Sequence, residues 1–300
     1  MRLPDFLIIG AQKAGTTSLY FDLLKNPAVF MPSDKELGNL LDDDVCTPRG
    51  RDVYAKLFKR ARPEQVCGEA STSYTKLPDH PGVPDRARRV LGADLKVIYI
   101  VREPISRIRS QHHHERYGAR ISCGIDEAVE RYPRFVDYCR YTMQITPWIE
   151  TFGRDHVLIL KFESYIAERQ TMADAISRFL GIDPAGVRVE PDVVYNASGG
   201  KPFRENHIEF VLSNPIYRNL VRPMLSAGAR QSLRRFLLPK APDSAETPSA
   251  ETVRYIVNEL AADVRRLGEI MGTDGPVWNL GDAGETASST PPARPTGTEE

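Results

Sequence analysis

The chain has 300 residues, of which 41% are hydrophobic, and this is enough to form one large buried core. Forty basic residues balance forty acidic ones, so the chain has no overall field to attract nucleic acid or an anionic membrane surface, and any anion site must be built locally. The four cysteines lack the spacing of metal ligands or of a disulfide framework, and we expect free buried thiols at Cys46, Cys67, Cys123 and Cys139.

The first predicted element is a strand at residues 5–9, an apolar run that stops at Gly10. Leu19, Leu23 and Leu24 then recur with helical spacing. The N-terminal segment therefore predicts a strand, a glycine turn and a helix. The apolar run is too short for the core of a signal peptide or for a spanning helix, so we expect a cytoplasmic protein with no integral membrane segment.

Two further units repeat this order of strand and helix. Residues 95–101 form a β-branched run of the kind buried in parallel sheets, and after Arg102-Glu103-Pro104 a polar helix is expected through about Glu115. A third strand is expected at residues 157–162, with a helix after it that ends near Gly181. This alternation predicts an α/β fold with a central, mostly parallel sheet flanked by helices. Because ligands bind at the carboxyl ends of such strands, the segments that follow the first two strands should face one crevice.

The C-terminal third is less regular. Residues 191–204 predict a long loop, of a kind that is usually functional, and residues 239–248 predict a linker or surface loop. A docking helix is expected to start at Thr247-Pro248, with apolar positions on one face at Ile256, Leu260, Val264, Leu267 and Met271. Residues 281–300 contain almost nothing apolar and predict a disordered tail, which leaves residues 1–280 as a single domain.

The segment from Gly10 to Ser18 joins the first strand to the first helix and reads Gly-Ala-Gln-Lys-Ala-Gly-Thr-Thr-Ser. Its glycines allow close approach to a ligand, and the amides at a helix N-terminus favour an anion. The spacing of the glycines matches a Walker A loop, but that motif has a lysine directly after the second glycine, where this chain has Thr16. The lysine is Lys13, inside the loop, within reach of the bridging oxygen of a phosphosulfate. The pattern argues against an ordinary ATPase or kinase, and the remaining alternative is a generic glycine turn.

These residues resemble the family of sulfotransferases that use 3′-phosphoadenosine-5′-phosphosulfate (PAPS). Residues 9–18 are similar to the family's 5′-phosphosulfate loop, which implies that this group is held by Lys13, Ala14, Gly15, Thr16, Thr17 and Ser18. Residues 98–104 are similar to its 3′-phosphate motif, so Arg102 and, eight residues later, Ser110 are expected to bind the 3′-phosphate. The similarity extends more weakly over most of residues 5–280 and implies a P-loop-like sulfotransferase fold.

The resemblance also implies how donor and product are bound. The segment 196–204 lies where sulfotransferases place a loop over the nucleotide, which makes Gly200, Lys201 and Arg204 candidates for binding it, with a basic surface loop as the alternative. The implied reaction is an in-line displacement that releases 3′-phosphoadenosine-5′-phosphate (PAP). It needs no metal, because Lys13 and the loop amides neutralise the departing oxygen.

The candidate base is Glu36, preceded by Lys35. This pair resembles the Lys-Glu that follows the first helix in heparan-type and many bacterial sulfotransferases, where the glutamate is the base. The alternative is an ordinary solvated acid on a loop, and Glu69 is the second candidate base. The three consecutive histidines at 112–114 cannot share a metal ion, since consecutive side chains on a helix point about 100° apart. We expect them to be polar surface, and the alternative is that one of them contacts the acceptor or acts as the base.

The acceptor is left open by the sequence. Leu37 and Ala70 stand where the sugar-sulfating branch usually carries a histidine and an active-site lysine, which puts a heparan-like acceptor in doubt. Residues 116–141 mix Arg, Tyr and Phe and would suit a small molecule, a glycan or a lipid-linked alcohol. The alternatives to a sulfotransferase are a P-loop small-molecule kinase and a nucleotide-binding protein without activity. No heptad pattern indicates an oligomeric state.

Overall fold

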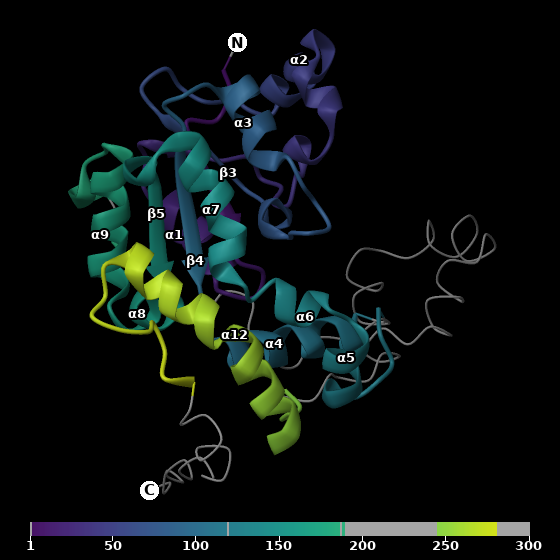
Figure 1. Cartoon of the computed structure of the whole chain (residues 1–300). Coiled ribbons are helices and arrows are strands. Elements are labelled where there is room, and N and C mark those ends of the chain that lie inside the picture. Colours follow the sequence, from purple (N-terminus) through teal and green to yellow (C-terminus); the bar gives the residue numbers. More distant parts are fainter. Residues whose placement is uncertain (1, 119, 187, 190–244, 281–300) are drawn as a thin grey trace, which may run out of the picture.

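The computed structural model describes residues 2–118, 120–186, 188–189 and 245–280 (Figure 1). The strands of this part form one five-stranded sheet in the order β2-β3-β1-β4-β5, and every neighbouring pair is parallel. The α/β fold with a parallel sheet is therefore confirmed. The strands are β1 (Phe6–Gly10), β2 (Val29–Phe30), β3 (Val66–Ala70), β4 (Lys96–Val101) and β5 (Val157–Lys161).

Helices follow each of the three predicted strands, as expected. Figure 1 shows α7 in front of β4 and α1 behind the sheet, so that helices cover both of its faces. The α-helices of the described residues are α1 (Thr16–Leu24), α2 (Pro48–Lys56), α3 (Val83–Leu91), α4 (Pro104–Tyr117), α5 (Ile125–Arg131), α6 (Arg134–Asp137), α7 (Tyr141–Phe152), α8 (Phe162–Ala167), α9 (Arg169–Leu180) and α12 (Ala250–Met271).

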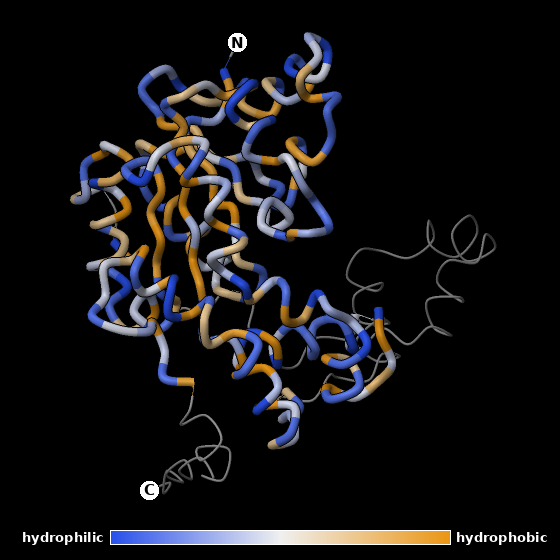
Figure 2. Tube along the Cα trace, in the orientation of Figure 1, coloured by the Kyte–Doolittle hydropathy of each residue, from blue (hydrophilic) through white to orange (hydrophobic). Residues whose placement is uncertain are grey.

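The core is centred on β1, the middle strand, and on its neighbour β4. The side chains of residues 6–9 in β1 and 97–101 in β4 are completely buried. The hydropathy colouring of Figure 2 shows apolar strands at the centre of the molecule and mainly polar outer turns. Burial on both faces is what a parallel sheet covered by helices requires, and it explains why these strands are continuous apolar runs.

Strand β3 was not expected as a strand, because it contains Gly68 and Glu69 in place of a β-branched run. It pairs with β1, where Gly68 lies opposite Phe6. A Cβ atom at Gly68 would lie 2.1 Å from Cζ of Phe6, so the phenyl ring requires a glycine at this position. The glycine that weakens the strand pattern is thus a packing requirement of the sheet.

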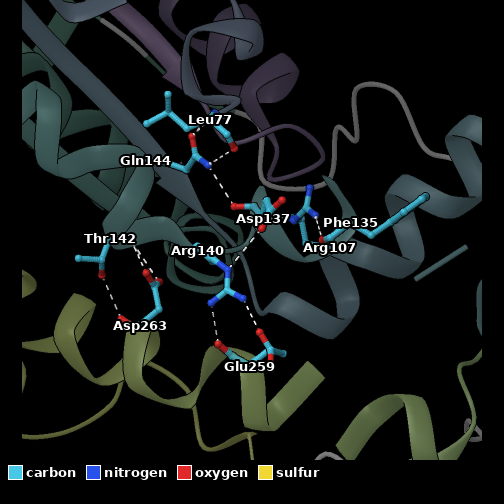
Figure 3. A network of polar contacts seen from close by, with 9 residues as sticks. All are labelled: Leu77, Arg107, Phe135, Asp137, Arg140, Thr142, Gln144, Glu259 and Asp263. Carbon is cyan, nitrogen blue, oxygen red and sulfur yellow. Dashed lines mark hydrogen bonds and ion pairs between the residues drawn. The ribbon is translucent and has the colours of Figure 1, made fainter. Parts of the chain in front are cut away.

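The predicted docking helix is α12, but its predicted start at Thr247-Pro248 is two residues too early. Ser249 is its N-cap and accepts a hydrogen bond from the Thr252 amide at 3.2 Å. Four of the five predicted apolar positions are buried, and Met271 is partly buried. The helix packs on α7, where the carboxylate of Asp263 accepts the amide of Thr142 at 3.1 Å and so caps the start of α7 (Figure 3).

Some expectations fall outside what the structure describes, namely the loop at 191–204 and the tail at 281–300. The four cysteines are free thiols, buried at Cys67 and Cys139 and partly exposed at the other two positions. Among the helices of the described residues, none is both long and apolar enough to span a membrane.

Candidate functional site

The loop between β1 and α1 lies at the carboxyl end of β1. Gly15 caps α1 with φ 91°, a left-handed conformation that favours glycine, and a Cβ atom there would lie 2.7 Å from the ring of Phe162. Lys13 also has a positive φ, 68°, and its side chain is partly exposed. The first amides of α1, from Thr16 onward, have no partner within the helix and open toward this end of the sheet. The loop therefore has the backbone form of an anion cradle.

Arg102 follows β4, the neighbour of β1, and reaches the loop. Its Nη1 donates to the carbonyl oxygen of Lys13 at 3.2 Å, and its guanidinium lies 4.8 Å from the ring centre of Phe162. The hydroxyl of Tyr141 donates to the Arg102 carbonyl at 2.6 Å, which fixes the strand end. Burial lowers the pKa of Arg102, and nearby carboxylates, that of Glu163 first, oppose this effect. The two predicted phosphate motifs thus meet at the carboxyl ends of β1 and β4.

A second arginine, Arg107, supports the same loop and was missed in the sequence. It is completely buried in α4, with Nη1 donating to the carbonyl of Gln12 at 3.4 Å and Nη2 to that of Phe135 at 2.8 Å. Its Nε lies 2.8 Å from the sulfur of Cys139. The position of Arg107 near the start of a helix that follows Arg102 was the signal that could have identified it. Nothing in the sequence marks Arg107 as buried.

The structure says less about the other residues that were predicted to bind the donor. Ser110 lies in α4, two helical turns beyond Arg102, and is 9% exposed. Gly200, Lys201 and Arg204 lie outside the described residues. Their roles stay predictions.

Lys35 joins the candidate base to the loop. Its ammonium donates to Oγ1 of Thr17 at 3.0 Å and lies 5.7 Å from the ring centre of Tyr20. Burial lowers the pKa of Lys35, and the neighbouring Glu36 opposes this effect. The structure thus places Lys35, the neighbour of Glu36 in the sequence, beside the first turn of α1.

Glu36 is exposed and is held at the carboxyl end of β3. Its amide donates to the carbonyl of Ala70 at 2.9 Å, and its Oε2 accepts the amide and the hydroxyl of Thr72 at 2.7 and 2.9 Å. Both side-chain bonds go to one oxygen, which leaves Oε1 outside them. An oriented and accessible carboxylate next to an anion loop has the geometry of a general base.

Glu69, the second candidate base, has the opposite environment. It is 1% exposed, and its carboxylate accepts the hydroxyl of Tyr74 at 2.5 Å and that of Tyr54. Burial raises its pKa to about 7, while the two tyrosine hydrogen bonds act in the opposite direction. A carboxyl enclosed in this way has no open path to an acceptor, which favours Glu36 as the base.

The prediction of polar surface for the three histidines is wrong for two of them. His112 and His113 are 1% and 4% exposed, and His114 is exposed. Nε2 of His112 lies 3.0 Å from the carbonyl of Cys123, which ties α4 to the following loop. The imidazoles of His112 and His113 therefore lie on the buried side of α4. The described residues contain no group of three or more His, Cys, Asp or Glu side chains arranged to hold a metal ion.

Comparisons with known proteins give a consistent result. The family model described as "Sulfotransferase domain" matches residues 3–197. The human bifunctional heparan sulfate N-deacetylase/N-sulfotransferase 3 is 28% identical over 204 residues, which cover 61% of this chain and 23% of the relative. The human heparan sulfate glucosamine 3-O-sulfotransferase 6 is 25% identical over 214 residues, 67% of this chain and 58% of the relative.

One further relative and one solved structure also match this chain. The membrane-associated sulfotransferase kil1 of Dictyostelium discoideum is 32% identical over 114 residues, 37% of this chain and 23% of the relative. The crystal structure of a sulfotransferase from Alicyclobacillus acidocaldarius has the same fold, with a TM-score of 0.63 at 20% identity over 91% of this chain and 98% of that one. The chain thus spans about a quarter of the length of the first curated relatives that it matches.

Proposed function

The chain belongs to the sulfotransferase domain family, and on this premise we propose that it transfers a sulfuryl group from PAPS to a hydroxyl or amine of an acceptor and releases PAP. The observation that carries the proposal is the contact between Arg102 and the carbonyl of Lys13, which joins the predicted 3′-phosphate and 5′-phosphosulfate motifs. The bond from Lys35 to Thr17 supports a position of the predicted catalytic pair beside the same loop. These contacts bring together residues that are up to 89 positions apart in the sequence.

In the proposed reaction, the acceptor oxygen or nitrogen attacks sulfur in line with the bond to the bridging oxygen. That bond breaks, and its electron pair goes to the 5′-phosphate oxygen of PAP. Lys13 and the amides of the first turn of α1 stabilise the charge on the departing oxygen. Glu36 takes the proton of the acceptor, and Thr72 holds the carboxylate in place for this step.

The donor would be held mainly through charge. Arg102 and Ser110, with Gly200, Lys201 and Arg204, are the proposed 3′-phosphate and nucleotide contacts, and residues 13–18 are the proposed 5′-phosphosulfate contacts. Lys35 adds a positive charge on the side of the loop that faces Glu36. None of these steps requires a metal ion, since the positive groups are supplied by the chain.

The acceptor and the location of the protein stay predictions. Two relatives are named for heparan sulfate, whereas Leu37 and Ala70 depart from the sugar-sulfating pattern, so a small molecule, a glycan and a lipid all remain candidate acceptors. A cytoplasmic location is likewise our prediction, and one relative is described as membrane-associated.

Calorimetry with PAP tests the donor site, with ATP in the presence and absence of Mg²⁺ as the comparison. We expect PAP to bind without Mg²⁺ and ATP to bind more weakly. Lys13→Ala and Arg102→Ala should each weaken PAP binding about ten- to a hundredfold, the value of a charge-assisted hydrogen bond.

The matched controls are Lys59→Ala and Arg88→Ala, which remove exposed cations of the same types, one in the turn after α2 and one on α3. Both should leave the affinity for PAP unchanged. Absence of PAP binding, or a preference for ATP with Mg²⁺, would reject the sulfotransferase and favour a P-loop kinase.

A further inference from the structure

Arg107 in α4 is a completely buried cation that binds neutral groups. Its guanidinium donates to the carbonyl oxygens of Gln12 and Phe135 and lies against the sulfur of Cys139. Among the described residues, no carboxylate oxygen lies within 4.0 Å of its nitrogens. Because a buried polar group is costly unless it is hydrogen-bonded, these three acceptors fix where the guanidinium can lie. One of them belongs to the anion loop.

The thiol of Cys139 orients this guanidinium. Its sulfur accepts Nε of Arg107 at 2.8 Å and donates to the carbonyl of Pro104 at 3.7 Å. Burial raises the pKa of Cys139, which favours the protonated thiol that this donation requires, and the charge of Arg107 opposes this effect. Nη2 donates to the carbonyl of Phe135 at 2.8 Å (Figure 3). With Nε and Nη2 both bound, the planar guanidinium has one orientation, in which Nη1 reaches the loop.

The contact of Nη1 lies next to a strained residue of the loop. Nη1 of Arg107 donates to the carbonyl of Gln12 at 3.4 Å, and the following residue, Lys13, has φ 68°, which is costly for a residue with a side chain. The carbonyl of Lys13 accepts Nη1 of Arg102 at 3.2 Å. The peptide groups on both sides of the Lys13 α-carbon are therefore each held by an arginine, which fixes the direction in which the lysine side chain leaves the loop.

The bond from Arg107 is a polar contact that holds Gln12 in place. The side-chain oxygen of Gln12 is buried and accepts no hydrogen bond from the described residues. The residue before it, Ala11, is fixed to β4 by its amide, which donates to the carbonyl of Ile100 at 2.7 Å. Without Arg107, the peptide between Gln12 and Lys13 would lose its link to α4.

The same guanidinium places a positive charge beneath the loop. In the proposed reaction, the bond to the bridging oxygen breaks and the 5′-phosphate of PAP gains negative charge. A cation that is fixed before the reaction stabilises this charge without having to reorganise. Because arginine keeps its proton in proteins, the charge of Arg107 is present over the whole working pH range.

We propose that Arg107 and Cys139 are positioning residues for the 5′-phosphosulfate group of the donor: the sulfur of Cys139 orients Arg107, and Arg107 holds the carbonyl of Gln12 so that Lys13 faces the bridging oxygen. This inference rests on the proposed function and adds two residues that act through the loop without touching the donor. Their effect should therefore be confined to the 5′ group and should not extend to the 3′-phosphate.

Calorimetry with three nucleotides separates the two ends of the donor site. The nucleotides are PAP, 3′-AMP, which lacks the 5′-phosphate, and 5′-AMP, which lacks the 3′-phosphate. The affinity of PAP divided by that of 3′-AMP, the 5′ ratio, measures the contact with the loop. The affinity of PAP divided by that of 5′-AMP, the 3′ ratio, measures the other end. In the unchanged protein we expect a 5′ ratio of about ten or more.

Two substitutions of Cys139 test its role with little change in volume. Cys139→Ala should lower the 5′ ratio about threefold or more, because Arg107 loses the acceptor of its Nε. Cys139→Ser should retain the 5′ ratio, because a hydroxyl accepts and donates as the thiol does. The 3′ ratio should be the same in both variants and in the unchanged protein.

Arg107→Lys tests the guanidinium itself. A lysine keeps the charge but not the planar fork that reaches three acceptors, so this variant should lower the 5′ ratio at least as much as Cys139→Ala does and keep the 3′ ratio. Cys67→Ala is the matched control, because it removes another completely buried thiol, near the start of β3. It should leave both ratios unchanged.

The outcomes separate this inference from the proposed function. Failure of the unchanged protein to bind PAP would contradict the proposed function and this inference with it. If PAP binds and a variant keeps the 5′ ratio, or lowers both ratios equally, the positioning role of the replaced residue is overturned. Equal losses of the 5′ ratio in Cys139→Ser and Cys139→Ala would overturn the role of the sulfur. If Arg107→Lys does not fold, the two Cys139 variants decide between these outcomes.

Discussion

At the residue scale, two glutamates near the end of β3 show how environment separates chemical roles. Glu36 is exposed, and its carboxylate is oriented by Thr72 through one of its oxygens. Glu69 is enclosed with two tyrosine hydroxyls, and burial raises its pKa to about 7. The sequence identified both as candidate bases, but burial, which distinguishes them, depends on the packing of β3 against α2 and could not be predicted from either residue's neighbours.

The raised pKa of Glu69 predicts how stability depends on pH. Its ordinary pKa is 4.5, so the folded protein holds this proton more tightly than the unfolded chain does. The free energy of unfolding should therefore fall as the pH rises from 4.5 to about 7, by up to about 3 kcal/mol from this group, and then level off. Urea unfolding at pH 5 and pH 8 measures this fall in the free energy of unfolding. In Glu69→Gln, the part of the fall that comes from Glu69 should be absent.

Glu269→Gln is the matched control for that measurement, because Glu269 is an exposed glutamate on α12. It should leave the difference between the two pH values unchanged. An equal difference in the protein with and without Glu69→Gln would show that Glu69 is ionised at little cost when folded.

At the element scale, the sequence predicted best where the signals are local. The strand, loop and helix at the N-terminus follow from an apolar run, two glycines and a helical period, and β4 with α4 follows from a similar pattern. Helix α7 was not predicted, because it contains Pro147 and the amide of Thr142 in its first turn is capped by Asp263, 121 residues further along the chain. A cap supplied from another element leaves no local signal.

The junction of loop and helix gives an element-scale prediction. Gly15→Ala should destabilise the fold for two reasons, the positive φ and the contact of a Cβ atom with the ring of Phe162 at 2.7 Å. Gly272→Ala is the matched control, since Gly272 has φ 73° and nothing within 4 Å of a Cβ atom. Both substitutions should lower the free energy of unfolding by about 1–2 kcal/mol because of the left-handed conformation. Gly15→Ala should lower it further because of the contact with Phe162.

Chemical unfolding and PAP calorimetry distinguish these two variants. We expect Gly15→Ala to bind PAP at least about tenfold more weakly, because the ring contact shifts the amides that form the anion cradle. Gly272→Ala should keep the full affinity. Equal losses of stability in both variants, with PAP binding intact, would mean that the ring of Phe162 moves aside and does not shape the loop.

At the scale of the whole molecule, the segment after α12 returns to the site. Nε1 of Trp278 donates to Glu163 at 3.1 Å, and the other carboxylate oxygen of Glu163 accepts the amide of Glu103 at 2.9 Å. The indole also lies 5.8 Å from the ring of Tyr141, whose hydroxyl binds Arg102. The contacts of Trp278 could not be predicted from the sequence, since they join positions 115 or more apart.

Truncation separates this segment from the residues that follow it. A chain ending at Leu280 should unfold and bind PAP as the full chain does, because residues 281–300 are predicted to lie outside the folded domain. A chain ending at Gly272 loses three buried side chains, Val277, Trp278 and Leu280, and should be less stable by at least about 3 kcal/mol. It should also bind PAP more weakly, because Glu163 and Tyr141, which support the strand end that carries Arg102, lose their contacts with Trp278.

Point variants at Trp278 show which contact matters in that truncation. Trp278→Phe keeps an aromatic ring against Tyr141 and removes the hydrogen bond to Glu163, whereas Trp278→Ala removes both. If the ring supports Arg102 through Tyr141, Trp278→Phe should keep most of the PAP affinity and Trp278→Ala should lose it. If the hydrogen bond to Glu163 is the support, both variants should lose PAP affinity to the same extent. Full PAP affinity in the chain ending at Gly272 would contradict both routes and confine the donor site to the sheet and the helices that precede α12.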